Sequence, residues 1–198
     1  MPSAAANPLI TPEEYLARER QAEFKSEYFA GEIFAMAGAS ERHILIVTNL
    51  ARELSTMLKK RPCKVYSTDM RVKVTQTGLY TYPDVIVICG DPSFEDERKD
   101  TLLNPMLVVE VLSASTEAYD RGKKFEHYRR TASLVEYLLI AQDQRRVEQF
   151  IKQSDGKWLF SEISAQDAVV KLPSVDCELS VAEVYDKVDF EKENEPKP

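Results

Sequence analysis

Two carboxylates interrupt stretches of the sequence that otherwise predict buried β-strands. Glu110 lies within Leu107-Val-Val-Glu-Val-Leu112, and Asp84 opens the run Asp-Val-Ile-Val-Ile-Cys89. Burying a carboxylate is costly unless a partner compensates its charge. A divalent cation is the obvious partner for two acids, and an all-oxygen ligand set favours Mg²⁺ or Mn²⁺. The sequence therefore predicts a metal site at Asp84 and Glu110 that polarises a phosphodiester and activates a water.

The expected geometry brings these acids together with a lysine. Side chains alternate between the faces of a strand, and in an antiparallel pair the start of one strand lies beside the end of the other. Asp120, Lys124 and Tyr128 are spaced by four residues along a helix predicted over 120–131, so they share one face. Lys124 is thus expected to place its ammonium near the scissile phosphate, where it orients the nucleophile and stabilises the developing charge.

Each of these residues also has a structural interpretation. Glu110 could pair with a buried arginine or lysine, and Asp84 could accept hydrogen bonds at the start of a strand. Lys124 taken alone is a solvated surface residue, and Asp120 could cap the helix. His43, just inside another predicted helix, is interpreted as a surface or packing residue. Only the combination favours a catalytic site.

The elements that must position the site follow from local sequence signals. Thr11-Pro12 predicts a helix start, Ala30-Gly31 the turn of a hairpin over 26–36, and Ser40 the cap of a longer amphipathic helix. Ser180 opens a short last helix, and 91–104 is expected to be a polar loop. Strands are predicted over 64–66, 70–75, 84–89, 106–112, 135–141, 146–151 and 157–163. This order favours an α/β or α+β class built around one mixed sheet.

Four motifs carry a family resemblance when they are taken in order. They are Tyr82-Pro-Asp84, Val109-Glu-Val-Leu-Ser113, Asp120-Arg-Gly-Lys-Lys124 with Tyr128, and Glu136-Tyr-Leu-Leu139. As a set they resemble the Uma-two family of restriction-endonuclease-like proteins, over roughly residues 11–185. The resemblance implies the PD-(D/E)XK nuclease fold, in which helices flank a central mixed sheet and the metal site lies at the sheet edge.

The resemblance also assigns roles to residues. Asp84 matches the acid of the first motif and Glu110 the acid of the second. Glu27, in a further matching stretch that continues to His43, corresponds to an additional acid that either ligates the metal or orients its water. The usual motif has a lysine two residues after the second acid, where this chain has Leu112. The resemblance therefore points to Lys124 on the following helix, with Lys123 as the alternative.

Length and charge limit the functions that are open to the chain. Its 198 residues suit one domain, expected over 11–188 between flexible tails at 1–10 and 189–198. The net charge of −7 disfavours binding through a broad positive surface but allows a local basic groove. Three functions remain: a DNA endonuclease, a non-catalytic protein that binds nucleic acid or a partner, and a hydrolase of another phosphate ester. A homodimer with paired sites is a further expectation. Candidates for the groove are Arg42, Arg71, Lys73, Arg121, Lys123, Arg129 and Arg130.

Cysteines and hydropathy predict the cellular setting. Cys63, Cys89 and Cys177 are scattered in apolar contexts without metal-ligand spacing, which favours buried reduced thiols and disfavours a zinc site. No apolar run approaches the ~18 residues of a membrane span, and the first residues do not resemble a secretory signal. A cytoplasmic protein with no membrane partner is expected.

Overall fold

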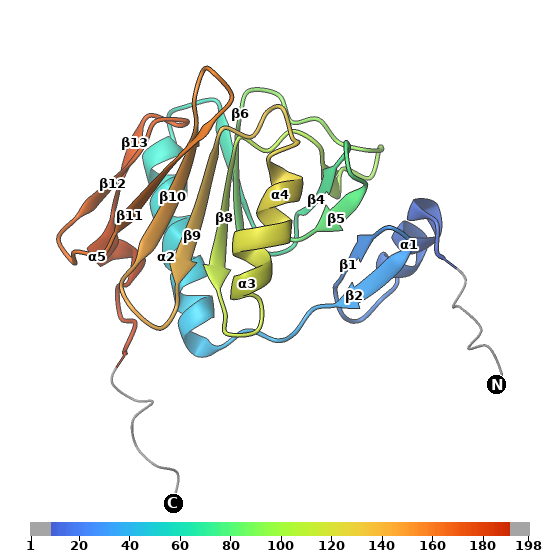
Figure 1. Cartoon of the computed structure of the whole chain (residues 1–198), viewed down its shortest axis with the longest axis horizontal. Helices are drawn as coiled ribbons and strands as arrows, with labels where there is room; N and C mark the ends of the chain where they lie inside the picture. The colour runs from blue at the N-terminus through green and yellow to red at the C-terminus, as the bar shows by residue number, and fades with distance from the viewer. Residues whose placement is uncertain (1–8, 191–198) are drawn as a thin grey trace, which may run out of the picture.

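The computed structural model describes residues 9–190, and a six-stranded mixed sheet forms its centre (Figure 1). β8 and β9 run parallel, and the other neighbouring strands are antiparallel. The predicted mixed sheet is confirmed. In spatial order the strands are β11 (Trp158–Ile163), β10 (Val147–Lys152), β9 (Glu136–Ala141), β8 (Leu107–Leu112), β6 (Val85–Cys89) and β3 (Cys63–Ser67).

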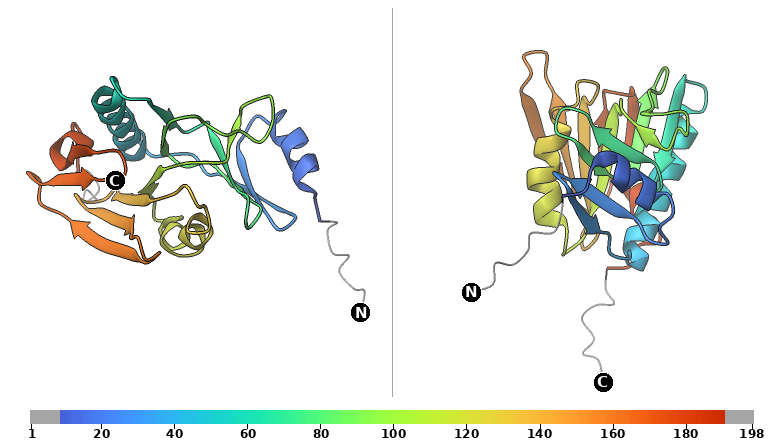
Figure 2. Two further views of the ribbon diagram at one scale, coloured as in Figure 1. Left: turned by 90° about the horizontal axis from the view of Figure 1, so that it is seen from above. Right: turned by 90° about the vertical axis from the view of Figure 1, so that its right-hand side faces the viewer.

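Helices cover both faces of this sheet (Figure 2). One face packs against α2 (Glu41–Leu58), which Ser40 caps as predicted. The other face packs against a helical segment made of α3 (Glu117–Tyr119), the π-helix η1 (Asp120–Lys124) and α4 (Phe125–Tyr128). Because side chains alternate along β8, its even-numbered and odd-numbered residues enter different cores. Glu110 therefore lies on the face that the α3–η1–α4 segment covers.

Two smaller sheets flank the central one, so the expectation of a single sheet is wrong. Short strands escaped prediction because two to four residues show no usable periodicity, and β7 falls in the stretch expected to be a loop. The predicted hairpin and its Ala30-Gly31 turn are confirmed, with both residues at positive φ. The five-stranded sheet contains β2 (Glu32–Ala35), β1 (Ser26–Phe29), β5 (Leu79–Thr81), β4 (Arg71–Val74) and β7 (Thr101–Leu102), and the two-stranded sheet contains β12 (Val169–Leu172) and β13 (Cys177–Ser180).

The ends of the described chain are two short helices. Thr11 closes a capping box on α1 (Pro12–Glu19), and Ser180 caps α5 (Val181–Val184), both as predicted. The tails expected at 1–10 and 189–198 lie almost entirely outside the described residues. Within residues 9–190, no helix has the length and apolar character needed to cross a bilayer.

The cysteines differ from the prediction of reduced thiols. β3 and β6 pair antiparallel with Cys63 directly opposite Cys89, and the two sulfurs form a disulfide. Sequence spacing hid this pairing, because 26 residues and a complete extra strand pair separate the two positions. Cys177 is free and half-buried.

Reduction of this disulfide is expected to lower the free energy of unfolding by about 3.5 kcal/mol, because the bond closes a loop of this length in the unfolded chain. The measurement is urea unfolding with and without dithiothreitol, in the wild type and in a Cys177→Ser variant that retains only the bonded pair. Superimposable unfolding curves under the two conditions would contradict the expectation.

Candidate active site

Asp84 and Glu110 lie opposite each other on neighbouring strands. β6 and β8 pair antiparallel with Val85 opposite Val109. One further step of the same register places Asp84 opposite Glu110, and residues directly opposite in a sheet project from the same face. The antiparallel pairing of β6 and β8 meets the condition under which the sequence placed the two acids together, and it brings them to one edge of the sheet.

Glu110 is buried, at 3% exposure, and its partners come from the helical segment. Its Oε1 lies 2.9 Å from Lys124 Nζ and accepts a hydrogen bond of 2.9 Å from the Tyr128 hydroxyl. Burial raises the pKa of Glu110 well above its usual range; Lys124 opposes this shift, and Asp120 and Asp84 add to it. The Glu110 side chain is therefore held in place, but Lys124 does not fully offset the cost of burying its negative charge.

Lys124 is the centre of a buried group of charges. Its Nζ lies 2.9 Å from Glu110 Oε1, 3.4 Å from Glu27 Oε1 and 3.4 Å from Asp120 Oδ1. We call these four residues the Lys124 cluster. Burial lowers the pKa of Lys124, but the three carboxylates outweigh burial and hold that pKa well above its usual range. Lys124 rather than Lys123 reaches Glu110, since Lys123 is exposed and lines a separate cavity.

The π-helix explains how Asp120 and Lys124 both face the sheet. The predicted helix over 120–131 instead starts at Glu117 and ends at Tyr128, and its middle turn, Asp120–Lys124, is π-helical. Such turns are rare, and they occur often at functional sites. The regular four-residue spacing predicted the shared face correctly, but it gave no sign of the wider turn.

Glu27 joins the cluster from the five-stranded sheet. It is buried on β1, and its Oε1 accepts a short hydrogen bond from the Thr81 hydroxyl in addition to its contact with Lys124. The ammonium thus bridges Glu27 and Glu110. Within residues 9–190, no group of three or more His, Cys, Asp or Glu side chains is gathered tightly enough to hold a metal ion. The expected convergence of Asp84, Glu110 and Glu27 into one ligand set is not found.

Asp84 contacts His43, which the sequence predicts to be a surface or packing residue. Its Oδ1 lies 2.9 Å from His43 Nε2, and its Oδ2 accepts a hydrogen bond of 2.7 Å from the backbone N–H of Val111. His43 is in the first turn of α2 rather than on a free surface. The available signal was its place at the end of the N-terminal stretch that carries the family resemblance. At 18% exposure, the Asp84 side chain is more accessible than the Lys124 cluster.

The site contains more acid than base. Asp84 and the three carboxylates of the Lys124 cluster face one ammonium, and burial together with neighbouring acids raises the pKa of both Glu110 and Asp120. Among the described residues, each Asp84 oxygen has one hydrogen-bond partner and a carboxylate oxygen can accept two, so Asp84 retains capacity for a further cation contact. In charge and donor type, this set of residues fits a divalent cation that prefers oxygen ligands.

The predicted basic groove does not form from several of its candidates. Arg71 is buried and donates to Tyr82 and Thr101, and Lys73 pairs with Glu95. Arg121 is neutralised in the same way, by Glu117 and Glu148. These three side chains are occupied inside the protein and are not available to a polyanion.

The fold defines the class of protein. The crystal structure of "a putative nuclease belonging to DUF820" from Anabaena variabilis matches with a TM-score of 0.73, over 89% of this chain and 97% of that one. At 22% sequence identity this likeness concerns the fold alone. This chain and the Anabaena structure therefore share the same fold, a mixed sheet with flanking helices.

Sequence comparison identifies the family. Residues 12–182 match Uma2, described as "Putative restriction endonuclease", and the chain belongs to this family. Two similar proteins come from Synechocystis sp.: "Uncharacterized protein sll1609" is 40% identical over 84% of this chain and 94% of its own length. "Uncharacterized protein slr1290" is 39% identical over 92% of this chain and 94% of its own length. The resemblance noted in the sequence motifs is confirmed.

Proposed function

We propose that the chain is a Mg²⁺- or Mn²⁺-dependent endonuclease that hydrolyses phosphodiester bonds of DNA. The observation that carries the proposal is the Lys124 ammonium 2.9 Å from Glu110, on the sheet edge where Asp84 lies opposite Glu110. In metal-assisted phosphodiester hydrolysis, carboxylates can hold the cation and an adjacent ammonium can stabilise the charge that develops at the phosphate. We assign the activity to one domain, residues 11–188, and its location to the cytoplasm.

Asp84 and Glu110 would hold the cation, because Mg²⁺ is commonly bound by one or two carboxylates together with waters and substrate phosphates. When bound, the cation would polarise the phosphodiester and lower the pKa of the attacking water. His43 and the Val111 N–H fix the Asp84 carboxylate, and Tyr128 fixes Glu110. Lys124 stabilises the negative charge that develops at the phosphate. Glu27 holds Lys124 from the other side and is placed to orient the water.

The test is cleavage of supercoiled plasmid and single-stranded DNA with Mg²⁺ or Mn²⁺, and with EDTA as the metal-free control. The Asp84→Asn variant keeps an acceptor for Val111 N–H but loses the negative charge, so we expect cleavage to fall by roughly three orders of magnitude. Asp167→Asn, at an exposed position, makes the same chemical change and should leave the rate unaltered. Equal cleavage by the two variants would refute the assignment of Asp84.

The second candidate is a non-catalytic protein that binds nucleic acid or a partner through the nuclease scaffold. The net charge of −7 and the three carboxylates around Lys124 favour it, since both oppose a phosphate at the site. Binding of nucleic acid or of a partner by well-folded wild-type protein that neither cleaves DNA nor responds to metal would establish this candidate. A homodimer, proposed because two sites are needed to cut both strands of a duplex together, is tested by the mass in solution.

A further inference from the structure

A cavity of about 550 Å³ lies beside the candidate active site. Three parts of the fold line it: the end of β1, the turn between β4 and β5, and the outer side of the α3–η1–α4 segment. The lining residues are Phe29, Gln76, Thr77, Lys123, Glu126, His127 and Arg130.

Two elements connect the cavity to Lys124: β1 and the α3–η1–α4 segment. On β1, Glu27 contacts Lys124, and Phe29 follows two residues later on the same face, about 7 Å along the strand. On the helical segment, His127 follows Lys124 by three residues, and its ring centroid lies 4.6 Å from that of Phe29. A chain of nucleotides with one phosphodiester at Lys124 would therefore bring the adjoining nucleotide to this cavity.

Positive charge exceeds negative charge in the lining of the cavity. Lys123 and Arg130 line it, and in the described part of the chain neither forms a salt bridge. Arg121, on the same helical segment, is instead paired with Glu117 and Glu148. Glu126 is the one acid among the lining residues, so two cations exceed one anion in a chain whose net charge is −7. Local positive charge of this kind suits a phosphate.

The same cavity offers an aromatic surface with an unused polar atom. The rings of Phe29 and His127 meet edge to face at 65°. His127 Nδ1 is buried, with no hydrogen-bond partner among the described residues, and such a group carries a desolvation cost until a ligand pairs with it. Burial lowers the pKa of His127 and Lys123 adds to the shift, while Glu126 opposes it. A neutral imidazole at this position can stack on a base through its face, while Nδ1, in the plane of the ring, can exchange one hydrogen bond with another group of the ligand.

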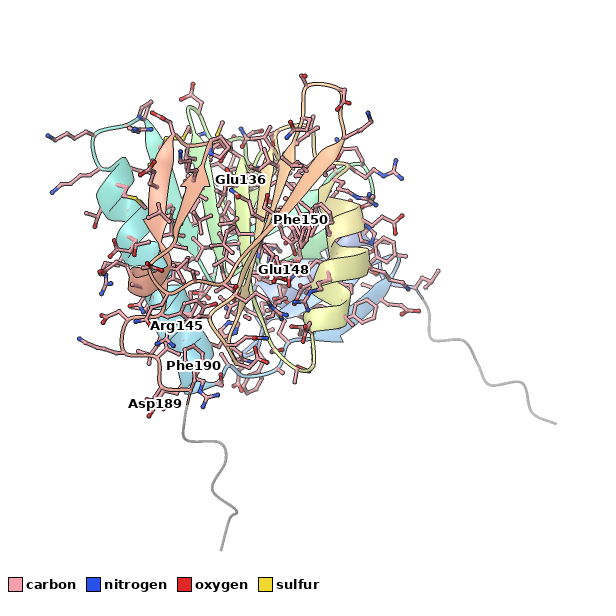
Figure 3. The ribbon with its side chains drawn as sticks, turned by 60° about the vertical axis from the view of Figure 1, so that its left-hand side comes forward. Glu136, Arg145, Glu148, Phe150, Asp189 and Phe190 are labelled. Atoms are coloured by element: carbon pink, nitrogen blue, oxygen red, sulfur yellow. A yellow bond between two sulfur atoms is a disulfide. The ribbon has the colours of Figure 1, made fainter. Side chains whose placement is uncertain are left out.

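A second cavity, of about 490 Å³ at the carboxyl ends of β8 and β9, lacks this character. Its charged lining mixes Arg42, Arg146 and Lys187 with a larger number of acids. Arg146 already contacts Glu148, and Arg145 covers the Phe190 ring near the end of the described chain (Figure 3). Because acids outnumber bases in its lining, that cavity favours a phosphate less than the cavity beside α4 does.

We propose that the cavity beside α4 binds one nucleotide of the DNA strand next to the bond to be cut. The base packs against Phe29 and His127, and the phosphate lies between Lys123 and Arg130. This inference rests on the proposed function for the identity of its ligand. Contacts that combine stacked bases with backbone phosphates are independent of sequence and favour an unpaired strand.

The first test is fluorescence anisotropy of a labelled single-stranded oligonucleotide, measured in EDTA so that no cleavage occurs. Lys123→Glu/Arg130→Glu is expected to weaken binding at least tenfold and to reduce the slope of log K against log salt by about 0.7, the effect of the one phosphate that the two side chains contact. The matched control is Lys59→Glu/Lys60→Glu, which makes the same change of charge at exposed positions directly after α2, the helix that packs on the other face of the central sheet from α4.

The second test addresses the base. A single abasic position is moved along the oligonucleotide, and binding by the wild type is expected to drop about tenfold at one position, because a stacked base is lost there. His127→Ala should bind that abasic oligonucleotide as well as the intact one. The variant removes no group of the Lys124 cluster, so its metal response should be unchanged.

The outcomes separate this inference from the proposed function. Cleavage by wild type with equal binding by the two double variants would overturn the nucleotide cavity and leave the nuclease. Binding that depends on Lys123 and Arg130 without any cleavage would support the cavity and remove the nuclease. Absence of both binding and cleavage by folded wild type would overturn both proposals.

Discussion

Replacing Lys124 with methionine is expected to lower the free energy of unfolding by about 3–5 kcal/mol, because it leaves buried carboxylates without their cation. Glu110, Glu27 and Asp120 all lie within 3.4 Å of the Lys124 ammonium. Methionine has a similar length and no charge, so the loss reports on electrostatics rather than on a cavity. If the proposed function is correct, cleavage should also fall by a factor of about 10²–10³.

The pH dependence of stability tests whether the loss in Lys124→Met comes from uncompensated carboxylates. The folded-state pKa of Glu110 is already raised in the wild type, and removing the ammonium raises it further. A group whose pKa is raised by folding contributes stability below its unfolded pKa and loses that contribution as pH rises through the folded pKa. The deficit of Lys124→Met relative to wild type should therefore be small near about pH 4 and grow towards pH 8. Urea unfolding at a series of pH values measures it.

Lys123→Met is the matched control, since it makes the same substitution at the preceding residue. Lys123 is exposed and forms no described salt bridge, so its loss should change stability by less than about 0.5 kcal/mol. Two results would contradict the charge imbalance in the Lys124 cluster. One is a loss of stability in Lys124→Met that does not change with pH. The other is an equal loss of stability in Lys123→Met.

The sequence predicted the central part of the site because strong local signals encode it. Glu110 and Asp84 stand out within apolar strands, and the spacing of Asp120, Lys124 and Tyr128 predicts a shared helical face. These signals require only the periodicities of strand and helix. The fold class followed from the same patterns, and the mixed sheet with its flanking helices and the structural likeness confirm it.

The parts that sequence reasoning missed depend on contacts between distant segments. His43 reaches Asp84 only because α2 begins at the same sheet edge, and Cys63 meets Cys89 only through the register of β3 and β6. Thr81 lies in a three-residue strand that no periodicity marks, yet it donates to Glu27. Tertiary register decides such contacts, and neither spacing nor propensity records it.

Because the site has more carboxylates than cations, Glu110→Gln is expected to have little effect on stability, whereas Lys124→Met is expected to have a large one. Glu110→Gln removes one of several acids that share a single ammonium, and the amide oxygen can still accept from Lys124 and Tyr128. Without metal, its stability at pH 8 is expected to stay within about 1 kcal/mol of wild type, in contrast to Lys124→Met.

With metal, Glu110→Gln should lose its response. If Asp84 and Glu110 hold Mg²⁺, a concentration one hundred times the dissociation constant stabilises the wild type by about 2.7 kcal/mol, and this gain should be absent from the variant. The control is Glu136→Gln on β9 (Figure 3), another buried carboxylate, which is bound by Gln149 and Ser174 away from the Lys124 cluster. That variant should be less stable yet gain as much from Mg²⁺ as the wild type does. Thermal unfolding with and without Mg²⁺ measures this gain. An equal gain in Glu110→Gln and wild type would show that Glu110 does not bind the cation, because a ligand loses its stabilising effect when its binding carboxylate is removed.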